Sequence, residues 1–112
     1  MSNRRFFACD MKDDPALIEK YKAYHADGTV WPEITESITS SGITNMEIFL
    51  AGNRLFMIMT TTDDYDGAAK AAADASSPKV QEWETLMDTF QQRLPFAQDG
   101  EKWVEMERIF KL

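Results

Sequence analysis

The segment Leu55-Phe56-Met57-Ile58-Met59 constrains the fold of this chain more than any other, because its five consecutive apolar residues leave no polar face. A strand with one solvated face alternates apolar and polar residues, whereas a strand without alternation is covered on both faces. The helices of one small domain cover one face of a sheet, and the other face then needs a second layer. The simplest second layer is the sheet of another copy, so this segment predicts a homodimer.

The strands expected around this segment form a small antiparallel sheet. Residues 43–50 and 54–61 predict two strands, joined by a hairpin turn at residues 51–53. An earlier strand is expected over residues 5–11, and a closing strand over residues 103–112. Glycine and polar residues between these segments mark the turns.

Capping signals predict four helices between the strands. A side-chain acceptor followed by proline is a typical helix start, because proline fits the first helical position, where no N–H is needed. Gly42 is expected to end the second helix in the left-handed conformation. The last helix is expected to carry an apolar stripe down to Leu94. The four expected starts are Asp14-Pro15, Pro32, Thr62-Asp63-Asp64 and Ser77-Pro78.

The order strand, helices, strand, strand, helices, strand is typical of the split βαβ, or ferredoxin-like, pattern. We therefore expect an α+β fold with an antiparallel sheet backed by helices. The 112 residues predict a single domain over 1–112. Two such domains packed sheet to sheet would form a dimeric α/β barrel.

Composition excludes several classes of partner. The 19 acidic residues outnumber the 12 basic ones, for a net charge of −7, and no basic stripe for nucleic acid is visible. No stretch approaches the roughly 20 apolar residues that span a bilayer. Cys9 is the sole cysteine and has apolar sequence neighbours, so we expect it to be buried. A single cysteine forms no disulfide within the chain, which is consistent with a reducing compartment. We expect a cytoplasmic protein that binds neither nucleic acid nor membrane.

The only histidine, His25, lies one helical turn after Tyr21 and shortly before Trp31-Pro32-Glu33. An imidazole with a pKa of about 6.5 gives or takes a proton near neutrality, and a phenol beside it orients a hydroxyl or tunes the ring. A histidine packed in the core, with its ring nitrogens bonded to backbone groups, is the alternative interpretation.

Metal and cofactor sites find little support in the sequence. One histidine and one cysteine far apart do not make a zinc site, and the paired aspartates stand where helices begin. Haem ligation by His25 is conceivable, but no sequence feature other than the histidine itself supports it. We expect neither a metal nor a cofactor.

Tryptophans and carboxylates are the other candidates for a binding site. Sugars stack their C–H faces on indole rings, although a single tryptophan is more often part of a core. Glu47 lies in the middle of a predicted strand, where a charge is least expected, and a solvent-facing position explains it equally well.

These motifs together resemble the L-rhamnose mutarotase family, whose signature is a tyrosine, a histidine four residues on, and a Trp-Pro-Glu shortly after. Here they stand as Tyr21, His25 and Trp31-Pro32-Glu33. The resemblance continues through residues 42–50 and the apolar strand, and then through Trp83 and residues 106–110.

The resemblance implies a cofactor-free, dimeric ferredoxin-like enzyme that interconverts the α and β anomers of a 6-deoxy-L-sugar. It makes His25 the general acid and leaves the base open between Glu47 and a water molecule. The substrate-binding positions it implies are Tyr21, Trp83, Met46, Glu82 and Trp31.

Three departures from the family pattern bear on the choice of sugar. Glu82 stands where the family has the first of two paired tryptophans, and Met46 stands in place of a binding tyrosine. The gap between His25 and Trp31 is two residues longer than in the rhamnose members. These changes favour the branch associated with L-fucose over L-rhamnose.

The sequence thus predicts an aldose 1-epimerase, or mutarotase, for L-fucose or L-rhamnose. Two alternatives stay open at this point. The first is a dimeric ferredoxin-like protein that binds haem or performs cofactor-free oxygen chemistry. The second is a non-catalytic sugar-binding module.

Overall fold

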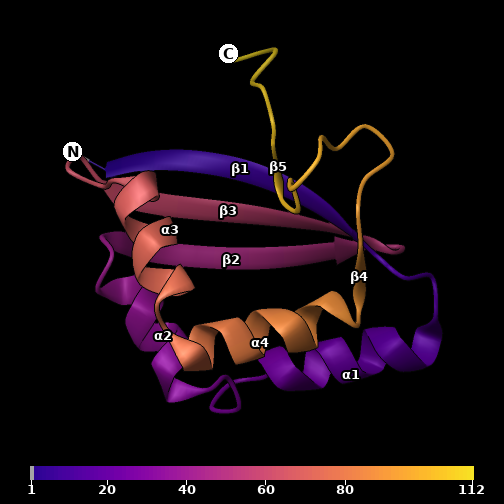
Figure 1. Ribbon diagram of the computed structural model, residues 1–112. Helices are drawn as coiled ribbons and strands as arrows, with labels where there is room; N and C mark the ends of the chain where they lie inside the picture. The colour runs from indigo at the N-terminus through magenta and orange to yellow at the C-terminus, as the bar shows by residue number, and fades with distance from the viewer. Residues whose placement is uncertain (1) are drawn as a thin grey trace.

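The computed structural model describes residues 2–112, which form one antiparallel sheet with four helices on one of its faces (Figure 1). This arrangement confirms the predicted α+β, ferredoxin-like fold. The elements, in chain order, are β1 (Ser2–Met11), α1 (Pro15–His25), α2 (Pro32–Thr39), β2 (Ile43–Ala51), β3 (Arg54–Thr62), α3 (Gly67–Ala75), α4 (Pro78–Asp88), β4 (Gln91–Gln92) and β5 (Val104–Glu105).

The sheet has the strand order β2-β3-β1-β4, and β5 pairs with Phe7 and Ala8 in the middle of β1. The register aligns Phe7 of β1 with Met57 of β3 and Ile48 of β2, all on the face toward the helices. Phe6 and Ile58 are aligned one position earlier on β1 and therefore lie on the opposite face. The predicted hairpin between β2 and β3 is confirmed.

Two helix starts follow their capping signals. The Asp14 carboxylate accepts hydrogen bonds from the N–H groups of Ala16 (2.9 Å) and Leu17 (3.3 Å), and the Ser77 hydroxyl accepts one from Val80 (3.4 Å). Both helices have proline at the first position, as predicted. Gly42 adopts a φ of +97° after α2, which confirms its expected left-handed conformation.

The start of α3 was wrongly predicted. Its cap is Asp66, whose carboxylate accepts from Ala68 (3.0 Å) and Ala69 (3.3 Å), and not the segment Thr62-Asp63-Asp64. Thr62 instead ends β3, where its N–H donates to the Gly42 carbonyl at 2.9 Å. Sheet pairing therefore extends β3 through a residue that the capping pattern assigned to the next helix.

The predictions for the C-terminal third also need correction. Helix α4 ends at Asp88, where Thr89 and Phe90 donate to carbonyls three residues back and tighten the last turn. Gln91 then pairs with Met11, so β4 stands where the helix was expected to continue. The closing strand is only Val104–Glu105, because pairing with β1 stops there.

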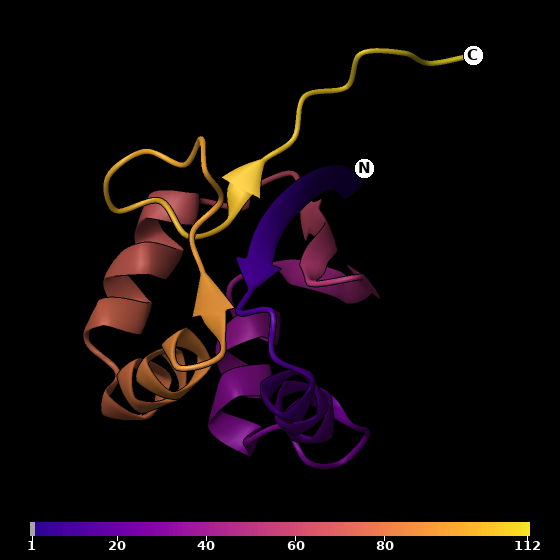
Figure 2. The same cartoon turned by 90° about the vertical axis from the view of Figure 1, so that its right-hand side faces the viewer.

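Residues 106–112, called the C-terminal tail here, leave the body of the protein after β5 (Figure 2). Met106 still donates to the Phe6 carbonyl at 2.7 Å. Beyond it, Ile109 is 91% exposed and Phe110 76% exposed. These apolar side chains find no cover within their own chain.

The core lies between the sheet and the helices. Leu55 and Met59 on β3 are almost fully buried, and Leu55 belongs to one core cluster with Trp83 and Met87 of α4. Cys9 is fully buried as expected, and burial raises the pKa of its thiol to about 11. No helix in residues 2–112 is long and apolar enough to cross a membrane. The cytoplasmic location stays a prediction.

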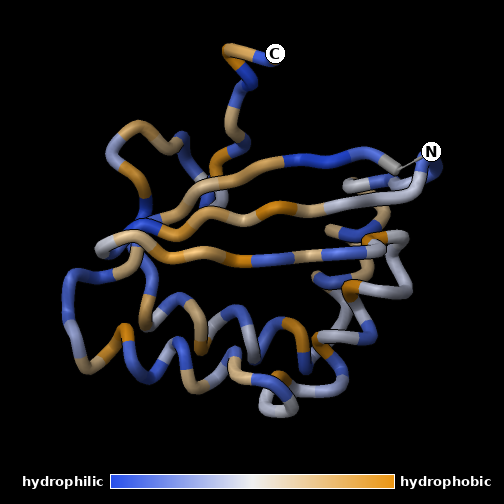
Figure 3. Tube along the Cα trace, turned by 180° about the vertical axis from the view of Figure 1, so that it is seen from behind, coloured by the Kyte–Doolittle hydropathy of each residue, from blue (hydrophilic) through white to orange (hydrophobic). Residues whose placement is uncertain are grey.

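The opposite face of the sheet is uncovered. Figure 3 shows consecutive apolar residues along β3, and neighbouring residues of a strand point to opposite faces, yet all four helices lie on one side. Phe6, Phe56 and Ile58 on the outer face stay half-buried, and Phe49 is 50% exposed. Strand β3 is therefore apolar on both faces, but the helices of this chain cover only one of them.

Gly42 provides a test of the turn between α2 and β2. A Cβ at Gly42 would lie 2.8 Å from Thr62 Oγ1, whereas a Cβ at Gly28, which has a φ of +78°, would meet nothing within 4 Å. Gly28→Ala should lower the free energy of unfolding by about 1–2 kcal/mol through backbone strain alone. Gly42→Ala should lower it by a further ~1–3 kcal/mol through the contact. Equal losses in urea denaturation would show that the close approach does not matter.

Candidate active site

A cavity of about 830 Å³ opens between the inner face of the sheet and the helices. Its volume is in the range of small-molecule sites. His25 and Tyr21 reach it from α1, and Trp83 reaches it from α4. Its lining also includes Arg5, Met46, Lys70, Asp74, Glu84, Gln91 and Lys102.

His25 is the last residue of α1, and its ring is held by its own helix. Nδ1 lies 2.8 Å from the carbonyl oxygen of Tyr21, one turn earlier. A carbonyl only accepts, so Nδ1 carries the hydrogen, and in the neutral ring Nε2 is the unprotonated nitrogen. A histidine packed in the core would have both ring nitrogens bonded to backbone groups. Here Nδ1 has such a bond, and no residue in the described part of the chain bonds Nε2.

Aromatic rings fix the imidazole from two sides. The Tyr21 ring lies beside it with centroids 4.3 Å apart, and the Trp83 ring meets it edge-on at 5.6 Å. Trp31 packs against the other side of Trp83 at 5.1 Å. The imidazole therefore has a defined orientation before any ligand enters.

Burial shifts both titrating groups in directions that keep them neutral. It lowers the pKa of His25 below its ordinary 6.5, and the hydrogen bond to the Tyr21 carbonyl opposes this only in part. It raises the pKa of Tyr21 to about 12, although the hydrogen bond from Gln91 acts in the opposite direction. At neutral pH the site holds a neutral imidazole beside a protonated phenol.

Gln91 is the site residue that sequence reasoning missed. Its Nε2 donates to the Tyr21 hydroxyl oxygen at 3.1 Å, and the side chain is buried. The apolar stripe of α4 predicted a helix through this position, which hid the strand that turns Gln91 toward Tyr21. No local sequence signal marks the pairing of Gln91 with Met11.

Two carboxylates that the sequence nominated lie outside the cavity. Glu47 is exposed on the outer face of β2, where it accepts a hydrogen bond from Asn45 at 3.0 Å. Glu82 precedes Trp83 on α4 and points to solvent, where it lies 3.5 Å from Lys79. The alternation of β2 and the helical rotation of α4 turn these residues away from the site.

Of the remaining predicted site residues, Met46 lines the cavity and Trp31 packs behind it. Met46 lines the cavity from β2, so its thioether takes part in shaping the wall. Trp31 lines a second, smaller cavity with Tyr24 and Phe90, and reaches the site only through Trp83. The structure thus brings together His25, Tyr21, Trp83 and Met46, with Trp31 behind them.

Charges at the far side of the cavity are mostly paired. Lys70 and Asp74 form a half-buried ion pair at 2.6 Å, and Lys102 bonds Asp88 at 3.0 Å. Arg5 bonds Glu105 through two nitrogens, at 3.0 and 2.7 Å. Within residues 2–112 no group of three or more His, Cys, Asp or Glu side chains is placed to hold a metal ion.

Comparison with known proteins identifies the family of this chain. Residues 4–112 match the family model described as L-rhamnose mutarotase. An L-fucose mutarotase of Xanthomonas campestris is 50% identical over all of this chain and 90% of its own length. A UPF0734 protein of Dictyostelium discoideum is 39% identical over 94% of this chain and 86% of its own length.

Two solved structures share the fold at 21% identity. The L-rhamnose mutarotase of Formosa agariphila superposes with a TM-score of 0.69 and covers 98% of both chains. The tetracenomycin F2 cyclase of Streptomyces glaucescens, a type-II polyketide cyclase, superposes with a TM-score of 0.65 over 98% of this chain and 96% of its own. At this identity the two structures describe a shared fold only.

These matches define the class of protein as an isomerase that acts on carbohydrates and interconverts the anomers of 6-deoxy sugars. The predicted enzyme class is confirmed, and it is favoured over the haem-binding, oxygenase and non-catalytic alternatives. The chain belongs to the L-rhamnose mutarotase family.

Proposed function

We propose that this enzyme interconverts the α and β anomers of L-fucose, with His25 and Tyr21 as the proton-transfer pair. The observation that carries the mechanism is the hydrogen bond from His25 Nδ1 to the Tyr21 carbonyl, which leaves Nε2 as a proton acceptor in the neutral ring. The relative that is 50% identical and named L-fucose mutarotase supports the choice of sugar. L-Rhamnose is the competing substrate, since the family model carries its name.

The walls of the cavity suit an uncharged sugar. Trp83 and Met46 offer apolar surface to C–H groups, and His25 and Tyr21 offer polar atoms to hydroxyls. The charged residues around the cavity are largely engaged with one another, as in the Lys70–Asp74 pair. An anionic substrate would have to break such pairs before it met a free cation.

Ring opening removes the proton of the anomeric hydroxyl and delivers one to the ring oxygen. His25 Nε2 takes the first proton, and the Tyr21 hydroxyl gives the second. The open-chain aldehyde then turns about its C1–C2 bond. Closure reverses both transfers: Tyr21 regains its proton from the hydroxyl that becomes the ring oxygen, and His25 returns its proton to the former carbonyl oxygen. Both groups end as they began.

This assignment changes the role that the resemblance implied for His25. A resting imidazole with a lowered pKa is neutral at pH 7 and starts the cycle as a base, and it acts as an acid only on closure. Tyr21 stays protonated in the resting site and is therefore available as the donor. Glu47 has no part in this mechanism, since it lies outside the cavity.

His25→Asn should fold but lose most of its activity toward L-fucose, by roughly 10²–10⁴-fold. That loss corresponds to about 3–5 kcal/mol in the barrier. Saturation-transfer NMR on an anomeric proton measures the exchange, with L-rhamnose and L-galactose tested in parallel and the uncatalysed rate subtracted. Glu82→Gln, on the solvent side of α4, is the matched control and should keep the parent rate. A parent that accelerates L-rhamnose but not L-fucose would overturn the proposed substrate.

The pH dependence separates a resting base from a resting acid. Burial places the pKa of His25 below 6.5, so the neutral form predominates above that pH. As a base, His25 gives a kcat/KM that is constant near neutrality and falls as the pH drops through this pKa. The same pKa is measured by NMR titration of the single imidazole. If kcat/KM falls as the pH rises through it, His25 works from its imidazolium form and our assignment is wrong.

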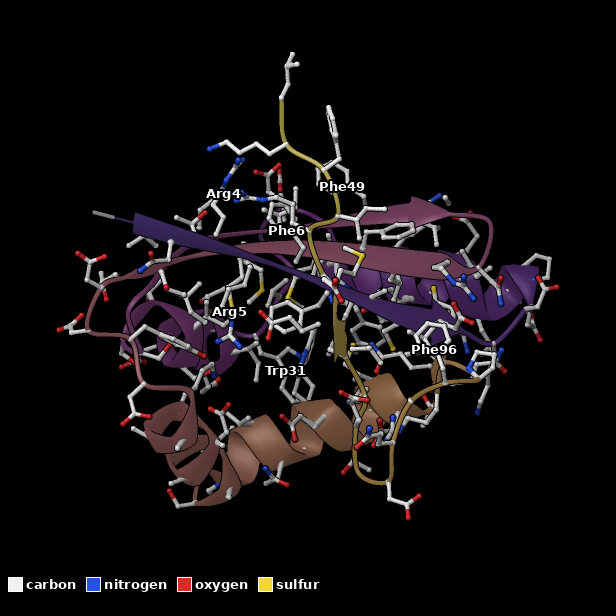
Figure 4. All side chains as sticks on the ribbon, turned by 90° about the horizontal axis from the view of Figure 1, so that it is seen from above. Arg4, Arg5, Phe6, Trp31, Phe49 and Phe96 are labelled. Carbon is white, nitrogen blue, oxygen red and sulfur yellow. The ribbon has the colours of Figure 1, made fainter. Side chains whose placement is uncertain are left out.

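We also propose that two copies associate through the outer face of the sheet. Figure 4 looks onto this face, where Phe6 and Phe49 lie with no helix above them. The C-terminal tail supplies further apolar groups, with Leu112 fully exposed and Phe110 76% exposed. A second sheet with its own tail offers matching apolar surface, and a closed two-fold pair covers both faces at once.

Phe49→Asp should convert this dimer into a monomer, because it places a charge within the apolar surface that the second copy would cover. Phe96→Asp is the matched control, since Phe96 is 66% exposed but lies in the loop after β4 (Figure 4). Light scattering coupled to gel filtration reads the mass of each variant. A parent chain that elutes as a monomer of 12.8 kDa would contradict the proposal.

A further inference from the structure

Gln91 joins the edge of the sheet to the catalytic helix. Its backbone pairs with Met11 of β1, and its side-chain Nε2 lies 3.1 Å from the Tyr21 hydroxyl oxygen on α1. Both side chains line the cavity, and both are more than nine-tenths buried, with 6% of Gln91 and 4% of Tyr21 exposed. This bond connects the Tyr21 phenol to the edge of the sheet.

The other end of the same amide has no partner. Gln91 Oε1 is buried and is the one side-chain oxygen or nitrogen in the described part of the chain that is buried without a hydrogen bond. A buried acceptor left in this way is destabilising, and a methionine of similar length would fill the space without that defect. Stability therefore does not explain an amide at this position, and its remaining feature is the donor that it presents to Tyr21.

A hydroxyl oxygen that receives an N–H directs its own hydrogen elsewhere. Because Gln91 donates to Tyr21, the phenolic hydrogen is turned away from the protein amide and is free for a ligand oxygen in the cavity. The Tyr21 ring lies beside the His25 ring with centroids 4.3 Å apart, so both proton-transfer groups face one region.

We propose that Gln91 is a positioning residue for mutarotation, which acts through Tyr21 and rests on the function proposed above. Gln91 orients the phenol as a donor to the ring oxygen of the sugar. When that proton leaves, the Gln91 N–H stabilises the negative charge on the tyrosine oxygen, and on closure the proton returns to the same oxygen. Gln91 itself neither gains nor loses a proton.

A double-mutant cycle tests this role. Gln91→Met should lower kcat for L-fucose exchange by roughly 10- to 100-fold with a smaller change in KM, because the bond strengthens as charge develops. Tyr21→Phe should lower kcat by at least as much. Since Gln91 acts through the phenol, Gln91→Met should have no further effect in the Tyr21→Phe background.

Gln92→Met is the matched control, because Gln92 is the exposed neighbour on the same strand and should keep the parent rate. The melting temperature of Gln91→Met should equal or exceed that of the parent, since the variant removes the unpaired oxygen. Gln91→Glu, which puts a second acceptor against the phenol, should be as slow as Gln91→Met.

The outcomes that overturn the proposal are distinct from failure of the function. If the parent does not accelerate anomer exchange for any 6-deoxy-L-hexose, the proposed function is wrong, and the positioning role that rests on it is withdrawn with it. If the parent is active, three results would reject the positioning role of Gln91 and leave the proposed function intact. These are a parent-like rate for Gln91→Met, losses that multiply in the double variant, and a rate loss that merely follows a lower melting temperature.

Discussion

Burial of the inner face of β3 against α1 and α4 is the interaction on which both the fold and the site depend. Leu55 projects from the strand into the core, where it forms one cluster with Tyr21 of α1 and with Trp83 and Met87 of α4. Hydrophobic burial of this kind has no direction of its own, so specific geometry has to come from polar groups placed at its margin. The bond from His25 to the Tyr21 carbonyl and the bond from Gln91 to Tyr21 supply that geometry.

Much of the fold is local enough to be predicted from the sequence. Asp14-Pro15 and Ser77-Pro78 set helix starts through their own side chains, and Gly42 takes the left-handed conformation that few other residues tolerate. The failures involve long-range pairing. Thr62 joins the sheet because Gly42 accepts its N–H, and Gln91 leaves the helix because Met11 pairs with it. A capping or periodicity pattern carries no information about such distant partners.

In the candidate site, too, the local features were predictable from the sequence and the long-range ones were not. The spacing of Tyr21 and His25 places them on one helix face, so their proximity followed from the sequence, and the family resemblance added Trp83 and Met46. The orientation of the groups did not follow: which imidazole nitrogen faces the cavity depends on a backbone carbonyl. Glu47 and Glu82 looked plausible because a carboxylate suits proton transfer, but strand alternation and helix rotation place them in solvent.

Arg5 lies where two parts of the molecule meet. It lines the cavity, and its guanidinium grips both oxygens of Glu105, the last residue of β5 before the C-terminal tail begins. A ligand in the cavity could hydrogen-bond to Arg5, and a neighbouring subunit that binds the tail could shift Glu105 and with it Arg5. The two binding events would therefore affect the same cation. Thermodynamic linkage makes such an effect reciprocal: whatever occupancy of the pocket does to the affinity between subunits, association does equally to the affinity for sugar.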